Sequence, residues 1–287
     1  MAEWQDDLLS ADILAGRGIE VEFVAWDDPE ADWESFDLAV IRSTWDYTGR
    51  LEEFLAWADR VGSERLRNVP DLIRWNTDKR YLAELDGAGL PVPPTALVAP
   101  GGLVPPFGGK IVIKPVSGAG ARDTGVFDEE NRDEGLALIE KLGDQDEIAM
   151  IQPYIDWVDE HGETAVLFFG GRFAYALRKK AFLPESGVAP VKPGTTVAAG
   201  MFDEDLMSLV EATDAEIELG AKTVAWLARR FGSMPLYARI DMVNSPVDEP
   251  VLMEVEATEP SLYLEKAAGL ETSGGELFAM AVEASLA

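Results

Sequence analysis

The stretch "YARIDMVN" (residues 237–244), followed after a few turn-forming residues by "PVLMEVEATEP" (250–260), decides the fold. Side chains in a strand alternate between the two faces, so Glu254 and Glu256 share one face, and Arg239 and Asp241 share one face of the preceding strand. The turn residues between the strands predict a hairpin. The sequence therefore predicts that three carboxylates and one guanidinium converge.

This convergence has two interpretations. Oxygen ligands without His or Cys are typical of a hard cation such as Mg²⁺, which makes Asp241, Glu254 and Glu256 candidate metal ligands. The alternative is a solvated strand face with a surface ion pair to Arg239. Glu-x-Glu alone favours the solvated face, and the adjacent Arg-x-Asp strand shifts the balance toward metal.

Composition limits the chemistry. The 287 residues are 47% hydrophobic, enough for a large core, and the formal charge of −29 opposes binding to nucleic acid or an anionic membrane. Zero Cys excludes disulfides and thiolate sites, and the single residue His161 disfavours imidazole metal sites and Ser-His-Asp triads. The acidity also suits a salty cytoplasm but does not establish one. Without an apolar run that could span a bilayer, or a signal peptide, the expected location is cytoplasmic.

The N-terminal part predicts an α/β unit. An amphipathic helix around Leu8 to Leu14 precedes a strand at Val21 to Val24, a buried strand at Leu38 to Ile41 and a second helix, "RLEEFLAWADRV". The two strands are expected to be parallel. Such a unit usually begins with an apolar strand, and a start codon assigned too far downstream would explain why no such strand precedes the first expected helix.

Further along, the pattern predicts a helix from Asn76 or Thr77 to Gly87, a Pro- and Gly-rich linker over 91–109, and a strand, glycine loop and strand in "KIVIKPVSGAGARDTGVF". "EIAMIQPYI" predicts a strand, and "GETAVLFFGGRFAYALRKK" predicts a hairpin turning at Gly170–Gly171. A long helix is expected over about 205–230.

The glycine loop and the cations near it also have alternatives. Glycines in "KPVSGAGARDTG" let backbone N–H groups face an anion, but the pattern matches neither the P-loop nor the dinucleotide fingerprint, and alone it favours a structural hairpin. Lys114 stands inside an apolar strand and needs an anion for its ammonium. Lys79 at a helix start is commonly an exposed residue, and Arg178 is either an edge charge or a phosphate clamp.

Seven segments in succession resemble the ATP-grasp superfamily, notably D-alanine:D-alanine ligase and glutathione synthetase. They are "NTDKRYLAEL", "GLPVPPT", "KIVIKPVSGAGARDTGV", "IQPYI", "GETAVLFFGGRFAYALRK", "YARIDM" and "LMEVEATEP". The resemblance implies an α/β (α+β) ATP-grasp fold in which two α+β subdomains sandwich ATP. The expected units are an N-terminal α/β domain (1–76), a small subdomain with a glycine-rich lid (77–152) and a C-terminal subdomain with the metal site (153–287).

The resemblance also implies residue roles. The ATP contacts it implies are Lys79 and Lys114 on the phosphates, the lid Ser117, Gly118, Ala119 and Gly120, Gln152, Tyr154 and Ile155 around adenine, Glu163 on the nucleotide or ribose, and Arg178 on the γ-phosphate. Asp241, Glu254 and Glu256 match ligands of Mg²⁺, with Mn²⁺ as the alternative, and Glu254 bridges two ions. Arg239 matches the residue that steadies the acyl phosphate, so the catalytic set is Arg239, Arg178 and Lys114. Many relatives carry Asn at position 256, and the extra charge here would tighten metal binding or alter metal preference.

"IRSTWDY" together with "EATEPSLYL" resembles a bacterial subgroup that includes the O-ureido-serine cyclo-ligase of cycloserine biosynthesis. This implies substrate contacts at Arg42, Thr44, Asp46, Tyr47 and Ser261. The segment follows a strand, at the edge where open α/β sheets bind ligands. The alternative is a strand-to-helix cap with Trp45 in the core.

The function implied is an ATP-dependent ligase. It activates a carboxylate of a small amino-acid-like substrate as an acyl phosphate, which an amine-type nucleophile attacks, either intramolecularly or as in dipeptide and other carboxylate–amine ligases. A kinase-like or carboxylating ATP-grasp enzyme and a catalytically inactive ATP-binding module are the alternatives. Homodimers are common among relatives, and the sequence leaves the oligomeric state open. It shows no dedicated general base.

Overall fold

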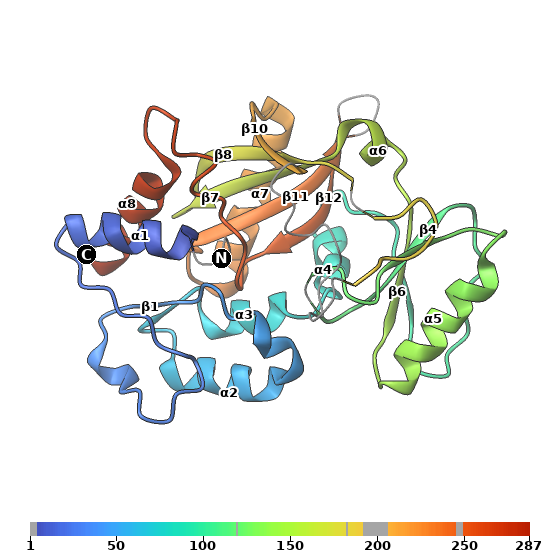
Figure 1. Ribbon diagram of the computed structural model, residues 1–287, viewed down its shortest axis with the longest axis horizontal. Coiled ribbons are helices and arrows are strands. Elements are labelled where there is room, and N and C mark those ends of the chain that lie inside the picture. Colours follow the sequence, from blue (N-terminus) through green and yellow to red (C-terminus); the bar gives the residue numbers. More distant parts are fainter. Residues whose placement is uncertain (1–4, 119, 182, 192–205, 245–248) are drawn as a thin grey trace.

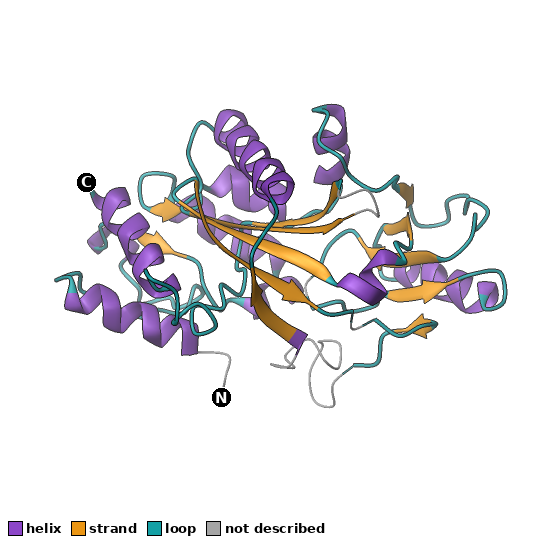
Figure 2. Ribbon diagram, turned by 90° about the horizontal axis from the view of Figure 1, so that it is seen from above, coloured by secondary structure: helices purple, strands orange, loops and turns teal. Residues whose placement is uncertain are grey.

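The computed structural model describes residues 5–118, 120–181, 183–191, 206–244 and 249–287 (Figure 1). Within these ranges the strands form two five-stranded antiparallel sheets and one parallel pair. Figure 2 shows the two larger sheets side by side along the long axis. The α/β fold class expected from the sequence is confirmed. None of the helices in these ranges is both long and apolar enough to cross a membrane.

The five-stranded sheet with the longer strands, called the larger sheet below, contains the predicted hairpins. Its strands, in spatial order, are β10 (Met207–Val210), β8 (Arg172–Lys179), β7 (Glu163–Phe169), β11 (Tyr237–Asn244) and β12 (Pro250–Glu256). The β7–β8 turn is at Gly170 and Gly171, both at positive φ (53° and 79°), as predicted. In the β11–β12 hairpin, Arg239 lies opposite Glu256 and Asp241 opposite Glu254, which confirms the predicted pairing.

Helix α7 (Asp214–Phe231) packs on the larger sheet. Gly220 lets it approach closely, because a Cβ there would lie 2.5 Å from a ring carbon of Phe168. The predicted start of this helix, about residue 205, is wrong. Thr213 forms a capping box with Glu216 and begins the helix at Asp214, and residues 207–210 pair with β8 as a strand instead. Residue 205 itself lies outside the described residues.

The smaller sheet consists, in spatial order, of β3 (Ala96–Val98), β6 (Ala149–Pro153), β4 (Ile111–Pro115), β5 (Gly125–Phe127) and β9 (Gly187–Val188). Helix α5 (Arg132–Asp144), at the right of Figure 1, lies against it. The predicted strands around the glycine loop are confirmed as β4 and β5. The predicted linker 91–109 contains strand β3, because residues 96–98 pair with β6.

The N-terminal part is held together by aromatic packing. Its elements are α1 (Gln5–Gly16), the 3₁₀ turns η2 (Trp33–Ser35) and η3 (Trp45–Gly49), β1 (Ala39–Val40), α2 (Leu51–Val61), β2 (Leu66–Arg67) and α3 (Pro70–Asn76). Trp26, Tyr47, Phe54 and Trp57 are buried together in the core of this part. Helix α1 lies beside α8 (Gly274–Leu286), the last helix of the chain (Figure 1).

Two strand predictions differ from the structure here. Residues 21–24 are not a strand, and Val21 and Phe23 are exposed, because no described strand offers them a hydrogen-bonded neighbour. The predicted strand 38–41 shortens to β1, whose parallel partner is β2.

The helix predicted from Asn76 or Thr77 is also divided. Helix α3 ends at Asn76, and α4 (Tyr81–Gly87) begins after a turn that contains Lys79. The remaining short helix, α6 (Trp157–His161), follows the segment predicted to frame adenine. The turn around Lys79 brings that lysine against the glycine loop.

Candidate active site

The β11–β12 hairpin carries a dense network of ions. Arg239 donates two hydrogen bonds to Asp241, from Nε to Oδ1 (2.8 Å) and from Nη2 to Oδ2 (2.9 Å), and a third to Glu256. Its Nη1 donates to the carbonyl of Ser261 (3.2 Å). Arg239 and Asp241 are almost fully buried, so their charges are compensated by each other rather than by water.

Glu254 faces the lysines. Lys79 Nζ lies 3.1 Å from Glu254 Oε1 and donates to the carbonyl of Gly118 at 2.8 Å. Burial opposes the charge of Lys79, but the neighbouring glutamates outweigh it and raise its pKa. Burial lowers the pKa of Lys114, and Glu254 partly offsets this. Both lysines predicted to meet phosphate therefore lie within the field of one carboxylate.

Glu256 has a different environment from Glu254. Burial and the charges of Asp241 and Glu254 raise its pKa to about 8, although Arg239 opposes the shift. For Glu254, burial also raises the pKa, but Lys79 and Lys114 outweigh it and lower the pKa to about 2. The pKa values of the two glutamates thus shift in opposite directions, so the two side chains need not both be charged, and this reduces the repulsion between them.

The predicted metal ligands fit a hard cation by their chemistry. Asp241, Glu254 and Glu256 present oxygen donors on one face of the hairpin, and each carboxylate oxygen has a lone pair beyond its present bond. Lys79 and Arg239 neutralise them here, and across the described residues no three acidic or imidazole groups are arranged to hold a metal ion. Metal binding would therefore exchange protein cations for the ion.

The glycine loop begins at the turn that holds Lys79. Lys79 donates its backbone N–H to the carbonyl of Val116 (2.7 Å), and Ser117 donates its hydroxyl to Glu147 (2.7 Å). Gly118 and Gly120 have positive φ (117° and 70°), as their predicted role in a tight loop requires. Ala119 lies outside the described residues.

On β8, adjacent residues point to opposite faces. The guanidinium of Arg178 donates to the carbonyl of His161 (2.8 Å). Lys179 Nζ instead lies 3.2 Å from Glu163, and its charge acts on Glu254 and Lys114. The strand therefore turns Lys179, rather than the predicted Arg178, toward the carboxylates of the hairpin.

The segment predicted to frame adenine follows β6. Gln152 is buried and donates to the hydroxyl of Thr95 (2.9 Å). Lys110 Nζ lies 3.9 Å from the centre of the Tyr154 ring, whose hydroxyl donates to Asp159. Ile155 follows at the start of the turn into α6 and is partly buried. These residues lie at the carboxyl end of β6, an interior strand of the smaller sheet.

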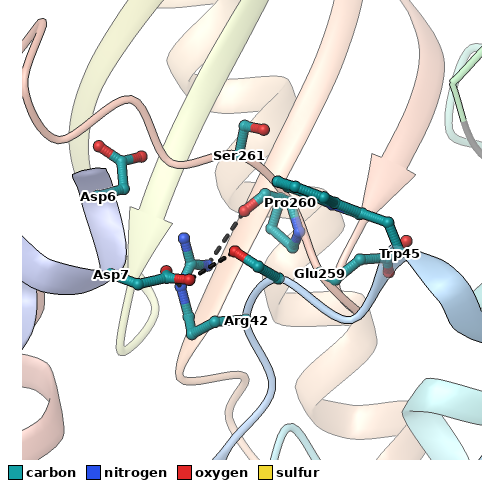
Figure 3. Close-up of a pocket in the computed structure, with 8 residues that line it drawn as sticks. Asp6, Asp7, Arg42, Trp45, Glu259, Pro260 and Ser261 are labelled. Carbon is teal, nitrogen blue, oxygen red and sulfur yellow. Dashed lines mark hydrogen bonds and ion pairs between the residues drawn. The ribbon is translucent and has the colours of Figure 1, made fainter. Parts of the chain in front are cut away.

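A small open pocket lies between the N-terminal part and the loop after β12 (Figure 3). Its lining residues are Asp6, Asp7, Arg42, Ser43, Trp45, Glu259, Pro260 and Ser261. Arg42 donates to Asp7 (Nε–Oδ1 3.0 Å) and to the carbonyl of Pro260 (3.1 Å), and so joins α1 to this loop. Because Arg239 binds the carbonyl of Ser261, the pocket adjoins the charged hairpin.

Some of the predicted substrate contacts line this pocket and others do not. Arg42 and Ser261 line it. Tyr47 is buried and donates its hydroxyl to Glu259, a pocket residue. The hydroxyl of Thr44 is buried without a hydrogen-bond partner among the described residues. Asp46 accepts from Trp26 Nε1 (3.2 Å), away from the pocket, so the structure does not bring it together with the others.

Sequence reasoning missed several residues of the site. Asp6 and Asp7 stand in the first turn of a helix, where acidic residues usually complement the helix dipole. Glu259 lies in a turn-like segment, and Lys179 looks like one of three exposed charges at a strand end. For Lys179 a signal was present, because period two places it on the face opposite Arg178.

The overall fold matches that of solved ATP-grasp proteins. D-alanine–D-alanine ligase from Bacillus anthracis, complexed with ATP, superposes with a TM-score of 0.63 at 17% identity and covers 100% of this chain and 94% of that one. The ATP-grasp ligase PsnB, in a complex with Mg and ADP, gives a TM-score of 0.62 at 17% identity, with 98% and 94% of the two chains covered. The fold is thus the ATP-grasp fold of nucleotide-dependent ligases.

One relative is closer. The cycloserine biosynthesis protein DcsG of Streptomyces lavendulae is 34% identical over 259 residues, which are 86% of this chain and 84% of DcsG. The crystal structure of D-cycloserine synthetase DcsG superposes with a TM-score of 0.85 at 29% identity over 100% and 96% of the two chains. The family model for the DcsG N-terminal domain matches residues 2–68. The chain belongs to the DcsG family, and it is an ATP-grasp ligase, an enzyme that forms C–N bonds.

Proposed function

We propose that the protein closes a ring in an O-substituted serine of the O-ureido-serine type. The substrate carboxylate becomes an acyl phosphate, and a nitrogen of the same molecule displaces the phosphate. The pocket of Figure 3 supports this proposal, because its lining is polar and Arg239 donates to the carbonyl of Ser261, one of its residues. The 34% identity to DcsG over most of both chains supports the same reaction class.

The roles follow from the charges. Lys79, Lys114 and Lys179 would meet the phosphates of ATP, and Arg239 would stabilise the oxyanion of the acyl phosphate and of the tetrahedral intermediate. Ser117 to Gly120 would cover the phosphates, and Gln152, Tyr154 and Ile155 would border adenine, with Glu163 on the ribose side. Arg178 is assigned to support of the β8 end through His161. When bound, Mg²⁺ (or Mn²⁺) supplies Lewis acidity at the phosphoryl oxygens, held by Asp241, Glu254 and Glu256.

The expected units remain part of the proposal: an N-terminal domain over 1–76 and two subdomains over 77–152 and 153–287 that enclose ATP. Strand β9 from the last of these completes the sheet of the second. The use of ATP agrees with the expected cytoplasmic location.

The test is an ADP-release screen with Mg²⁺ over amino acids and O-substituted serines, followed by mass analysis of the product. Ring closure predicts one product with the mass of the substrate less one water, because a carboxylate oxygen leaves with phosphate, or a fragment of that product, and independence from any added amine. A requirement for a second amine would instead identify an intermolecular ligase. ADP release with a stable phosphorylated product would identify a kinase, and either outcome refutes ring closure.

A matched pair of variants tests the assignment on β8. Lys179→Met removes the cation that faces the hairpin, and Arg178→Met removes its neighbour on the other face. Removing a group that stabilises transition-state charge costs about 10²- to 10³-fold in turnover. We expect this loss for Lys179→Met and a much smaller loss for Arg178→Met. The reverse order would restore Arg178 as the phosphate contact.

A further inference from the structure

The three carboxylates of the pocket are held in different ways. Asp7 is bound by Arg42 and by the hydroxyl of Ser43, and Asp6 accepts a backbone N–H from Glu265 (3.3 Å). Glu259 accepts from the neutral hydroxyl of Tyr47. A carboxylate paired with a guanidinium is a weak base, because the cation stabilises its ionised form. Glu259 has no such pairing to a side chain at hydrogen-bond distance among its described partners.

Glu259 also lies where the two halves of the site meet. The next two residues, Pro260 and Ser261, accept hydrogen bonds through their carbonyls from Arg42 and Arg239. The loop is therefore fixed on the pocket side by Arg42 and on the hairpin side by Arg239. Glu259 thus lines the pocket and stands two residues before the carbonyl that Arg239 binds.

We propose that the carboxylate of Glu259 is the general base that accepts the proton of the attacking nitrogen. The inference rests on the proposed ligase reaction. The nitrogen lone pair forms the C–N bond to the acyl carbon, the C–O bond to phosphate breaks and its electron pair leaves with phosphate, and the N–H proton passes to Glu259.

The surroundings suit this role. The charged and titratable groups that act on Glu259 are Tyr47 on η3, Lys79 in the turn before α4 and Glu254 on β12, and Glu256 on β12 and Tyr237 on β11 feel its charge in turn. Burial raises the pKa of Glu259 to about 7, while Tyr47 and Lys79 limit the rise. A general base is most effective when its pKa lies near the working pH.

The test separates the proton transfer from the formation of the acyl phosphate. With a substrate that the wild-type chain turns over, Glu259→Gln should reduce the turnover of ring product by about 10²- to 10⁴-fold. The variant should still make the acyl phosphate, which hydroxylamine traps as a hydroxamate without help from a base. We therefore expect Glu259→Gln to form hydroxamate at the wild-type rate. The wild-type kcat should fall as the pH drops below neutral, and the kcat of the variant should not.

Two further variants complete the design. Asp6→Asn removes one carboxylate from the same pocket and should keep the acidic fall in kcat. Tyr47→Phe removes the hydrogen bond that lowers the pKa of Glu259, so the fall should move to higher pH, and this holds even if Glu259→Gln does not fold.

The proposal is overturned if Glu259→Gln keeps the wild-type kcat and raises only KM, which would make Glu259 a contact for a substrate ammonium. Loss of hydroxamate together with ring product also overturns it, because an earlier step would then be affected. So does an acidic fall that Tyr47→Phe leaves in place. A wild-type chain that releases no ADP with any substrate of the screen refutes the proposed function itself, which is a separate outcome.

Discussion

Replacing Arg239 by Met should reveal how strongly the buried ion pair with Asp241 holds the larger sheet. Both carboxylate oxygens of Asp241 are bound by Arg239, at 2.8 and 2.9 Å, and only 4% of either side chain is exposed. Arg239→Met leaves this carboxylate charged, buried and unpaired. Breaking a buried pair in this way costs about 3 to 5 kcal/mol.

Glu256 adds little to that cost. Its side chain is 28% exposed, and with a pKa raised to about 8 by burial it can take up a proton. At about 2 to 4 °C per kcal/mol, the loss in Arg239→Met corresponds to a fall in Tm of roughly 6 to 20 °C.

The assay is a double-mutant cycle followed by urea and thermal denaturation without nucleotide. Asp241→Leu combined with Arg239→Met removes both charges, so the double variant should recover much of the stability that Arg239→Met loses. Ligase activity should stay lost in both. A single variant as stable as the wild type, or a double variant whose losses simply add, would refute the reasoning.

Three smaller effects follow from other contacts. Gly220→Ala should lower the free energy of unfolding by about 1 to 3 kcal/mol in urea melts, because its Cβ would meet Phe168 at 2.5 Å; Gly87→Ala, with no atom within 4 Å of the new Cβ, is the control and should lose nothing. Burial raises the pKa of Glu259 from 4.5 to about 7, so the folded state favours the protonated carboxyl. The stability that this contributes is complete below pH 4.5 and is lost as the pH rises through 7. Glu259→Gln should flatten the plot of stability against pH over this range, and an unchanged slope would contradict the assignment. Asn68→Ala should lower the free energy of unfolding by about 2 to 3 kcal/mol, because the buried side-chain amide forms hydrogen bonds with three backbone groups at 2.7 to 2.9 Å. A fall in Tm smaller than about 2 °C for each of these kcal/mol would contradict the prediction.

The predictable parts of the fold are those with local signals. The β11–β12 hairpin follows from alternation and a turn, and both are properties of neighbouring residues. Residues 21–24 show the same alternation and yet form no strand, because a strand also requires a hydrogen-bonded neighbour, which local sequence does not specify. Residues 207–210 are the reverse case, a strand that exists through its pairing with β8.

The residues of the candidate site also fall into those placed by local sequence and those brought together by the fold. Spacing along one strand places Glu254 and Glu256 together and separates Arg178 from Lys179. The pocket, however, is assembled from residues 6–7, 42–43, 45 and 259–261. Asp7 and Glu259 meet Arg42 and Tyr47 only after the chain folds. Nothing in the sequence near Asp7 distinguishes it from other acidic residues, and "EATEPSLYL" indicates the region of Glu259 without indicating its carboxylate.

The ion pair between Arg42 and Asp7 bears on how the substrate preference of such an enzyme can change in evolution. The groups assigned to ATP come from the two sheets, the loops that follow their strands and the turn before α4, whereas much of the pocket comes from α1 and the segment after β1. Replacing the N-terminal part while keeping its contact to the carbonyl of Pro260 would therefore exchange the recognition surface and leave the phosphate chemistry intact. If the pocket binds substrate as proposed, chimaeras joined near residue 68, where the family model for the N-terminal domain ends, should transfer substrate preference between members of the family.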